Sequence, residues 1–136
     1  MTIKTFDAQV NQLDNVIEFI ENELKKYDCS FKVKISINIA VEEIFANLCH
    51  YAYPNIDGTV DISIVYDNSD NSINICISDF GIKFNPLECD DPDITLSAQD
   101  REIGGLGIFI CKKTMDKLSY EYKNRKNNLY IKKIIK

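Results

Sequence analysis

Long apolar runs are missing from this sequence. No run approaches the roughly 20 apolar residues of a membrane-spanning helix. The first ten residues, MTIKTFDAQV, lack the basic start and the apolar core of a signal peptide. With 136 residues, of which 45% are apolar and 27% charged, the composition is that of a soluble chain large enough to bury a core. We therefore expect a single domain over residues 1–136, located in the cytoplasm.

Closely spaced cysteine pairs are also missing. The number of cysteines is odd, and three of the five lie inside apolar runs; the five are Cys29, Cys49, Cys76, Cys89 and Cys111. This pattern favours reduced, buried thiols over a disulfide framework or a zinc site. The chain has a single histidine, His50, which we expect to lie at the surface or at an edge.

Positive charge is in the minority, since the formal net charge is −5. General nucleic-acid binding is therefore not expected. The charge is unevenly distributed: residues 87–102 contain six acids and one base, whereas residues 112–136 contain nine bases and two acids. Two interpretations remain open, a solvated acidic loop with a basic final hairpin, or a surface that docks a partner.

Internal repeats and low-complexity linkers are absent, so local periodicity has to predict the elements. Apolar residues recur at helical spacing over Asp7–Lys26. The start of Phe31–Tyr53 fits a strand alternation as well as a helical stripe, but only the helical stripe continues through the whole segment. We therefore predict a helix there, capped by Asp28 or Ser30.

Beyond Pro54 the apolar period changes to two, which predicts strands and hairpins. The expected strands are Thr2–Phe6, Val60–Tyr66, Ile73–Ser78, Ser119–Lys123 and Leu129–Ile135, with polar turns at 67–72 and 124–128. The long irregular segment Gly81–Ile103 is typical of a lid over a site, and Gly104–Leu118 is expected to be a helix opened by glycines. This order predicts an α+β sandwich: a mixed, mostly antiparallel sheet with helices on one face.

Glu43 and Asn47 are the first candidate site residues. They lie four residues apart on the long predicted helix, about 40° apart around its axis, so they share a face at the edge of the apolar stripe. A carboxylate and an amide at that boundary suit a metal ion or a polarised water. Taken alone, the pair is more often simply part of a helix surface.

The glycine-rich run from Gly104 to Gly107 is the second candidate. Glycines before an apolar helix permit a close approach of the backbone, and the helix start offers unpaired N–H groups to an anion such as phosphate. A plain glycine turn with a closely packed helix explains the same residues equally well.

The third candidate is Asp79 with Gly81, at the end of a strand-like run. A carboxylate there can accept a hydrogen bond from an exocyclic amine, and the glycine makes room for a planar ring. The alternative is a turn in which the aspartate bonds its own backbone.

The three candidates occur in an order that resembles the GHKL (Bergerat-fold) ATP-binding superfamily: Glu-x-x-x-Asn, then Asp-x-Gly, then Gly-Gly-Leu-Gly before a helix. The segments VEEIFANLCHYAYP, DFGIKFNP and IGGLGIFICKKTMDKLSYEY are similar to those of bacterial anti-sigma factors that are also serine/threonine protein kinases. The likeness extends from about Phe6 to Lys133. It implies the GHKL two-layer sandwich with an ATP lid, and the length fits a free-standing domain better than a sensor histidine kinase.

The resemblance implies a role for each matching residue in binding ATP or ADP with Mg²⁺. Asn47 matches the asparagine that ligates magnesium, and Glu43 matches the general base. Asp79 matches the aspartate that bonds the adenine amine, and Gly81 matches the glycine beside it.

The phosphate-binding residues follow from the same resemblance. Gly105 and Gly107 match the glycines that contact the phosphates, with Gly104 and Leu106 beside them. Arg101 corresponds to a lid arginine that contacts the terminal phosphate, although its spacing to the glycines is one residue longer than in some members.

Two positions depart from the family pattern. Many members have a histidine four residues after the magnesium asparagine, where this chain has Tyr51. Members also often have Gly-Thr in the last strand, where Asn128 and Leu129 are expected here, so adenine binding is expected to be weaker or mediated by water.

The implied function is an anti-sigma factor that phosphorylates an anti-anti-sigma protein and sequesters a sigma factor in a partner-switching system. A homodimer is also implied, and Ile35 and Ile39, on the helix face opposite the apolar stripe, suggest a second packing surface. Two alternatives remain: a nucleotide-dependent binding module without kinase activity, and a small ATPase that acts alone. Glu43 favours the kinase over the first, and the lack of a further mechanical domain disfavours the second.

Overall fold

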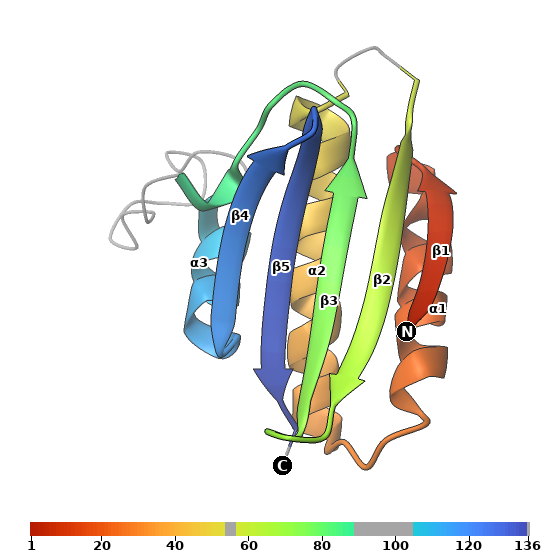
Figure 1. The fold of residues 1–136 in the computed structure, drawn as a ribbon, viewed down its shortest axis with the longest axis vertical. Helices are drawn as coiled ribbons and strands as arrows, with labels where there is room; N and C mark the ends of the chain where they lie inside the picture. The colour runs from red at the N-terminus through yellow and green to blue at the C-terminus, as the bar shows by residue number, and fades with distance from the viewer. Residues whose placement is uncertain (54–56, 89–104, 136) are drawn as a thin grey trace.

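A five-stranded sheet carries helices on one of its faces, with the core between the two layers (Figure 1). The computed structural model describes residues 1–53, 57–88 and 105–135. The elements of these ranges are β1 (Thr2–Asp7), η1 (Val10–Gln12), α1 (Leu13–Leu24), α2 (Phe31–Tyr51), β2 (Thr59–Asp67), β3 (Ser72–Asp79), η2 (Pro86–Glu88), α3 (Gly105–Thr114), β4 (Lys117–Lys123) and β5 (Lys126–Ile134).

The strand order is β1-β2-β3-β5-β4, and every neighbouring pair is antiparallel. The α+β class and the helices on one face are confirmed, but the described sheet is wholly antiparallel rather than mixed. The reason is that each sheet neighbour is reached by a hairpin or by a connection that returns the chain in the opposite direction.

The alternation in β3 explains how a carboxylate enters the interior. Ile73, Ile75 and Ile77 are each at most 2% exposed, because successive odd positions face the helices. Asp79 continues this register and is 2% exposed. The last residue of an apolar strand therefore delivers its charge to the buried face of the sheet.

Helix α2 lies across the centre of the sheet, between α1 and α3 (Figure 1). The capping residue is Ser30, whose side chain accepts a hydrogen bond from the Val33 N–H, and not Asp28. The face predicted to be apolar is buried, whereas Phe31, Ile35 and Ile39 form an exposed row at intervals of four residues.

Two predicted helix boundaries differ from those of the structure by four residues or more. The helix expected over Asp7–Lys26 starts only at Leu13, because β1 extends to Asp7 and η1 intervenes. Helix α3 ends at Thr114 rather than Leu118, since the Asp116 N–H bonds the Lys132 carbonyl and draws the chain into the sheet.

The last hairpin is also tighter than predicted. Its turn consists of Asn124 and Arg125 alone, and both have positive φ (56° and 63°). Two-residue turns with this backbone conformation match the right-handed twist of the strands that they connect. Strand β5 therefore begins at Lys126, three residues earlier than expected, and Asn127 becomes a sheet residue.

The cysteines of the described residues are free thiols; Cys29, Cys49 and Cys111 are buried. Burial is the main cause that raises the pKa of Cys49 to about 11 and that of Cys111 to about 12, so both stay protonated and unreactive. In residues 1–53, 57–88 and 105–135, no helix has the length and apolar character needed to cross a membrane, and no group of three or more His, Cys, Asp or Glu residues could hold a metal ion. Cys89 lies outside these ranges.

Candidate functional site

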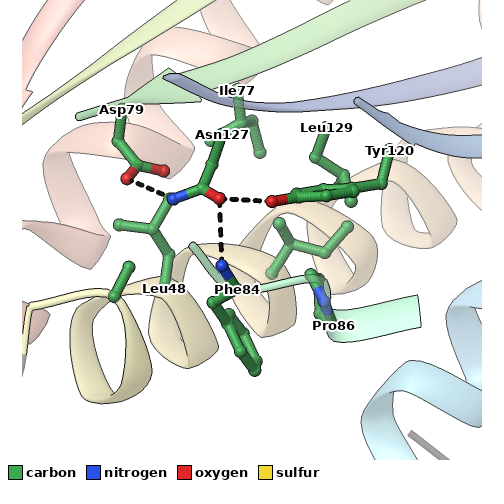
Figure 2. A pocket seen from close by; sticks show the side chains of 10 residues that line it. Leu48, Ile77, Asp79, Phe84, Pro86, Tyr120, Asn127 and Leu129 are labelled. Carbon is green, nitrogen blue, oxygen red and sulfur yellow. Dashed lines mark hydrogen bonds between the residues drawn. The ribbon is translucent and has the colours of Figure 1, made fainter. Parts of the chain in front are cut away.

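A small pocket lies between α2 and the end of the sheet at which β3 stops (Figure 2). Its volume is about 20 Å³, room for about one water molecule. It is lined by Ile44, Leu48, Ala52, Ile77, Asp79, Phe84, Pro86, Tyr120, Asn127 and Leu129. The lining is apolar apart from a few converging polar groups, which is the character of lining found in small-molecule sites. A nucleobase is larger than this space, so the wall has to move for one to enter.

Asp79 provides the charge of the pocket. Its Oδ1 accepts hydrogen bonds from the Gly81 N–H at 2.8 Å and from Asn127 Nδ2 at 3.0 Å. Its Oδ2 is buried and has no hydrogen-bond partner among the described residues. Burial raises the pKa of Asp79, and the bonds from Asn127 and Gly81 offset part of that rise. An unpaired buried carboxylate oxygen is costly, so a ligand N–H at this point would be strongly favoured.

Gly81 sits where any side chain would collide with the chain itself. A Cβ there would lie 2.6 Å from the Ala52 carbonyl oxygen and 2.9 Å from Asp79 Oδ1. The same carbonyl accepts a hydrogen bond from the Ile82 N–H at 2.9 Å. The glycine thus lets the segment after β3 lie directly on the end of α2.

Asn127 is a pocket residue that the sequence pattern did not predict. It is 4% exposed and stands opposite Asp79 in the β3–β5 register (Figure 2). The position expected for the family Gly-Thr was Asn128-Leu129, but Asn128 pairs with Ser78 and bonds its hydroxyl at 2.7 Å, while Leu129 lines the pocket. Counting back by two from the buried residues Ile131 and Leu129 identifies Asn127.

Glu43, Asn47 and Gly107 come together at the start of α3. Asn47 is 8% exposed, and its Nδ2 donates to the Glu43 carbonyl at 2.8 Å and to Glu43 Oε1 at 3.1 Å. A Cβ on Gly107 would lie 2.0–2.4 Å from the Glu43 carboxylate, so the first turn of α3 packs directly against that group. Ile44 and Leu48, the neighbours of this pair on α2, line the pocket, which places the two clusters side by side along one helix.

The first turn of α3 offers favourable electrostatics for an anion. The helix has ten residues and starts at Gly105, so its first N–H groups, which have no intrahelical partners, and the positive end of its dipole lie where Glu43 places its carboxylate. Leu106, in the same turn, is 39% exposed. Arg101 and Gly104, and most of the segment predicted to be a lid, lie outside the described residues.

His50 is exposed, as expected. Its ring meets that of Tyr51 edge-on, with 6.5 Å between the ring centroids. The Tyr51 ring in turn lies 5.0 Å from that of Phe84, a pocket residue. Tyr51, which stands where many family members have a histidine, therefore packs against a residue of the pocket wall.

Comparison with known proteins gives one family. The model of the histidine kinase-like ATPase domain matches residues 6–133. No curated protein matches the chain.

Replacing Asp79 by asparagine should separate stability from binding. Asp79→Asn removes a buried charge, so the unliganded protein should unfold at the same temperature or a few degrees higher. Its affinity for ADP should fall by tens of fold, because an amide N–H would face the adenine amine, at a cost on the order of 2 kcal/mol. Calorimetry with ADP and GDP tests this, with Asp61→Asn on the other face of the sheet as the control. Equal binding of ADP and GDP by the wild type, or unchanged affinity in Asp79→Asn, contradicts the assignment.

A methyl group at Gly107 should displace the Glu43 carboxylate without unfolding the chain. The colliding atoms are the end of a flexible side chain, and alanine is favoured over glycine in a helix by about 1 kcal/mol. Gly107→Ala should therefore unfold at a temperature no lower than the wild type, yet bind Mg–ADP on the order of tenfold more weakly, as expected for one lost charge-assisted hydrogen bond. Ile110→Ala, at an exposed position further along α3, is the control, and wild-type affinity in Gly107→Ala would show that the contact is irrelevant to binding.

Proposed function

Because the chain belongs to the histidine kinase-like ATPase domain family, which is of the GHKL type, we propose that it is an ATP-binding anti-sigma factor with serine/threonine protein kinase activity. Its substrate would be a hydroxyl group of an anti-anti-sigma protein. The observation that carries this proposal is the grouping of Glu43, Asn47 and Gly107 beside a pocket that contains an unpaired Asp79 oxygen.

The adenine ring would bind between Asp79 and the apolar pocket lining. Asp79 Oδ2 would accept a hydrogen bond from the exocyclic amine, and Leu48 with Ile77 would contact the ring. A 6-oxo purine would place a carbonyl oxygen against the carboxylate and be rejected.

The residues at the start of α3 fit magnesium and phosphate. The Asn47 amide directs its nitrogen at Glu43, and its oxygen is the kind of ligand that Mg²⁺ prefers. Magnesium would supply charge neutralisation between the phosphate groups. The N–H groups of the first turn of α3 would bind phosphate oxygens; Gly107 adds no side chain of its own there, and the Glu43 carboxylate that packs against it would have to turn away.

Glu43 would act on the protein substrate as the general base. Its carboxylate would take the proton of a serine or threonine hydroxyl as that oxygen bonds the terminal phosphorus, while the bond from phosphorus to the leaving oxygen breaks and ADP departs. The hydrogen bond from Asn47 to Glu43 Oε1 would orient the carboxylate.

One observation favours the alternative, a nucleotide-dependent binding module without kinase activity. The Glu43 carboxylate accepts a hydrogen bond from Asn47 and packs against the α3 turn, which is also what a purely structural side chain would do.

We also propose a homodimer that binds a sigma factor in the cytoplasm. The family resemblance supports it, and so does the exposed row of Phe31, Ile35 and Ile39, which are 77%, 41% and 41% exposed. An apolar row of this kind on a central helix suits a protein–protein contact.

Substitution of Glu43 should separate catalysis from binding. Glu43→Gln should retain Mg–ATP affinity, because a glutamine oxygen can still accept from Asn47, and lose phosphotransfer by roughly 10²–10⁴-fold. Asn47→Ala should lose both. The assay is transfer of labelled phosphate from ATP to the purified anti-anti-sigma protein, with Glu42→Gln, on the exposed face of the same helix, as the control.

Two outcomes decide between the candidate functions. Transfer at the wild-type rate by Glu43→Gln contradicts the kinase mechanism. ATP-dependent binding of a sigma factor by wild-type protein that labels no acceptor supports the binding module.

A charge on the exposed row should break the dimer. Light scattering at high micromolar concentration should report a dimer for the wild type and a monomer for Ile39→Lys, because burying an unpaired ammonium in the contact is costly. Val65→Lys, a comparably exposed apolar position on β2, should remain dimeric. A monomeric wild type, with and without nucleotide, contradicts the proposal.

A further inference from the structure

The Asn127 side chain connects three separate parts of the pocket. Its Nδ2 donates to Asp79 Oδ1 and to the Ile82 carbonyl oxygen, each at 3.0 Å. Its Oδ1 accepts from the Phe84 N–H at 3.0 Å and from the Tyr120 hydroxyl (Figure 2). The amide has two N–H donors and an oxygen with two lone pairs, so these four bonds use its full capacity.

The first consequence concerns Asp79. The Asn127 and Gly81 donors both bond Oδ1, which fixes the carboxylate and leaves Oδ2 as the oxygen available to a ligand. Two donors on one oxygen also favour the ionised form, which can only accept hydrogen bonds.

The second consequence concerns the segment Ile82–Phe84, here called the wall segment. Asn127 bonds the backbone at both of its ends, and the Phe84 side chain forms part of the pocket lining. Since the pocket holds only about 20 Å³, a nucleobase has to displace wall residues such as Phe84 or Tyr120, and both of these bond the same Asn127 oxygen.

We propose that Asn127 is a positioning residue that determines which nucleobase the pocket accepts, by holding Asp79 as an acceptor and by bonding the wall segment that a 6-amino purine has to displace. The inference rests on the proposed binding of ATP. Asn127 acts through Asp79 and the wall segment, and its replacement should change the choice of base as well as the affinity.

Asn127→Asp tests this with almost no change of shape. The Oδ1 acceptor is retained, and a carboxylate oxygen replaces the donor 3.0 Å from Asp79. Two carboxyl groups this close do not ionise together easily, so they share a proton until the pH is well above the usual range of aspartate. The shared proton can replace the Asn127 N–H, so the variant should bind Mg–ADP best at acid pH.

The expected result is an inversion of the pH profile of ADP affinity. Wild-type affinity should fall at acid pH, where Asp79, whose pKa burial raises, becomes protonated. Affinity of Asn127→Asp should fall on the order of tenfold or more as the pH rises from 5 to 9, because the doubly ionised pair repels. A purely structural role would give a deficit that does not depend on pH.

Among the residues that the structure describes, the titratable groups whose pKa is coupled to Asp79 do not change charge in this range. Cys49 and Tyr53 from α2 and its end, and Tyr120 from β4, each have a pKa raised mainly by burial, that of Cys49 to about 11. They therefore remain neutral from pH 5 to pH 9.

Asn127→Ser provides a second, uncharged test should the aspartate variant not fold. Serine is too short to bond Asp79 and the wall segment together, so the ratio of Mg–ADP to Mg–IDP affinity should drop about tenfold, the equivalent of one lost hydrogen bond in the discrimination. IDP is the matched probe because inosine replaces the 6-amine of adenine by an oxygen.

Two control variants complete the experiment, which is calorimetry with ADP and IDP between pH 5 and pH 9. Asn128→Asp makes the same chemical change on the opposite sheet face and should retain the wild-type ratio and profile. Tyr120→Phe removes one hydrogen bond to the Asn127 oxygen and leaves the bonds of Asp79 in place. It should change the affinity for both nucleotides but not the ratio of Mg–ADP to Mg–IDP affinity.

Each outcome has a definite meaning. A wild type that binds neither nucleotide overturns the proposed ATP binding and this inference together. A wild type that binds ADP, with Asn127→Asp following its pH profile or Asn127→Ser keeping its base ratio, overturns only the role of Asn127.

Discussion

Burial of one carboxylate at the end of an apolar strand is the constraint on which the rest of the site depends. Asp79 is 2% exposed, and burial disfavours its charged form and so raises its pKa. Asn127 and the Gly81 N–H both bond one carboxylate oxygen, and the wall segment lies where Asn127 fixes its backbone. The groups around the pocket therefore offset part of the cost of a buried charge, which is an arrangement common at binding sites.

Helix α2 connects the pocket that contains Asp79 to the cluster of Glu43, Asn47 and Gly107. Its 3.6-residue period places Ile44 and Leu48 in the pocket lining, while Glu43, on an adjacent face, meets the start of α3 and accepts a hydrogen bond from Asn47. Both halves of the proposed site are thus held by one helix that packs on the sheet. Because the helix is rigid, the spacing between the two clusters is fixed by the sequence interval along α2 rather than by a loop.

The sequence predicts those parts in which period and chemistry agree. Strands β2 and β3 follow from their strict alternation, α2 follows from a stripe too long for a strand, and Asp79 stands out as an acid after an apolar run. Asn127 was missed because NRKNN reads as one polar turn, and nothing local shows that Asn124 and Arg125 alone adopt positive φ. Contacts between distant segments, such as the Gly107 backbone against Glu43, depend on how α3 packs and have no local signal.

The two-residue turn between β4 and β5 has a consequence beyond its own surface position. In a hairpin the number of turn residues sets the pairing register, and a shift by one residue exchanges the two faces of the strand. One inserted residue that slipped β5 past β3 would remove the Asn127 amide from Asp79 and present a neighbour such as Lys126 or Asn128 instead. Exposed turns usually tolerate insertions and deletions. Here the length of such a turn would be constrained, because it sets the register that brings Asn127 to Asp79 in a pocket that the turn itself does not line.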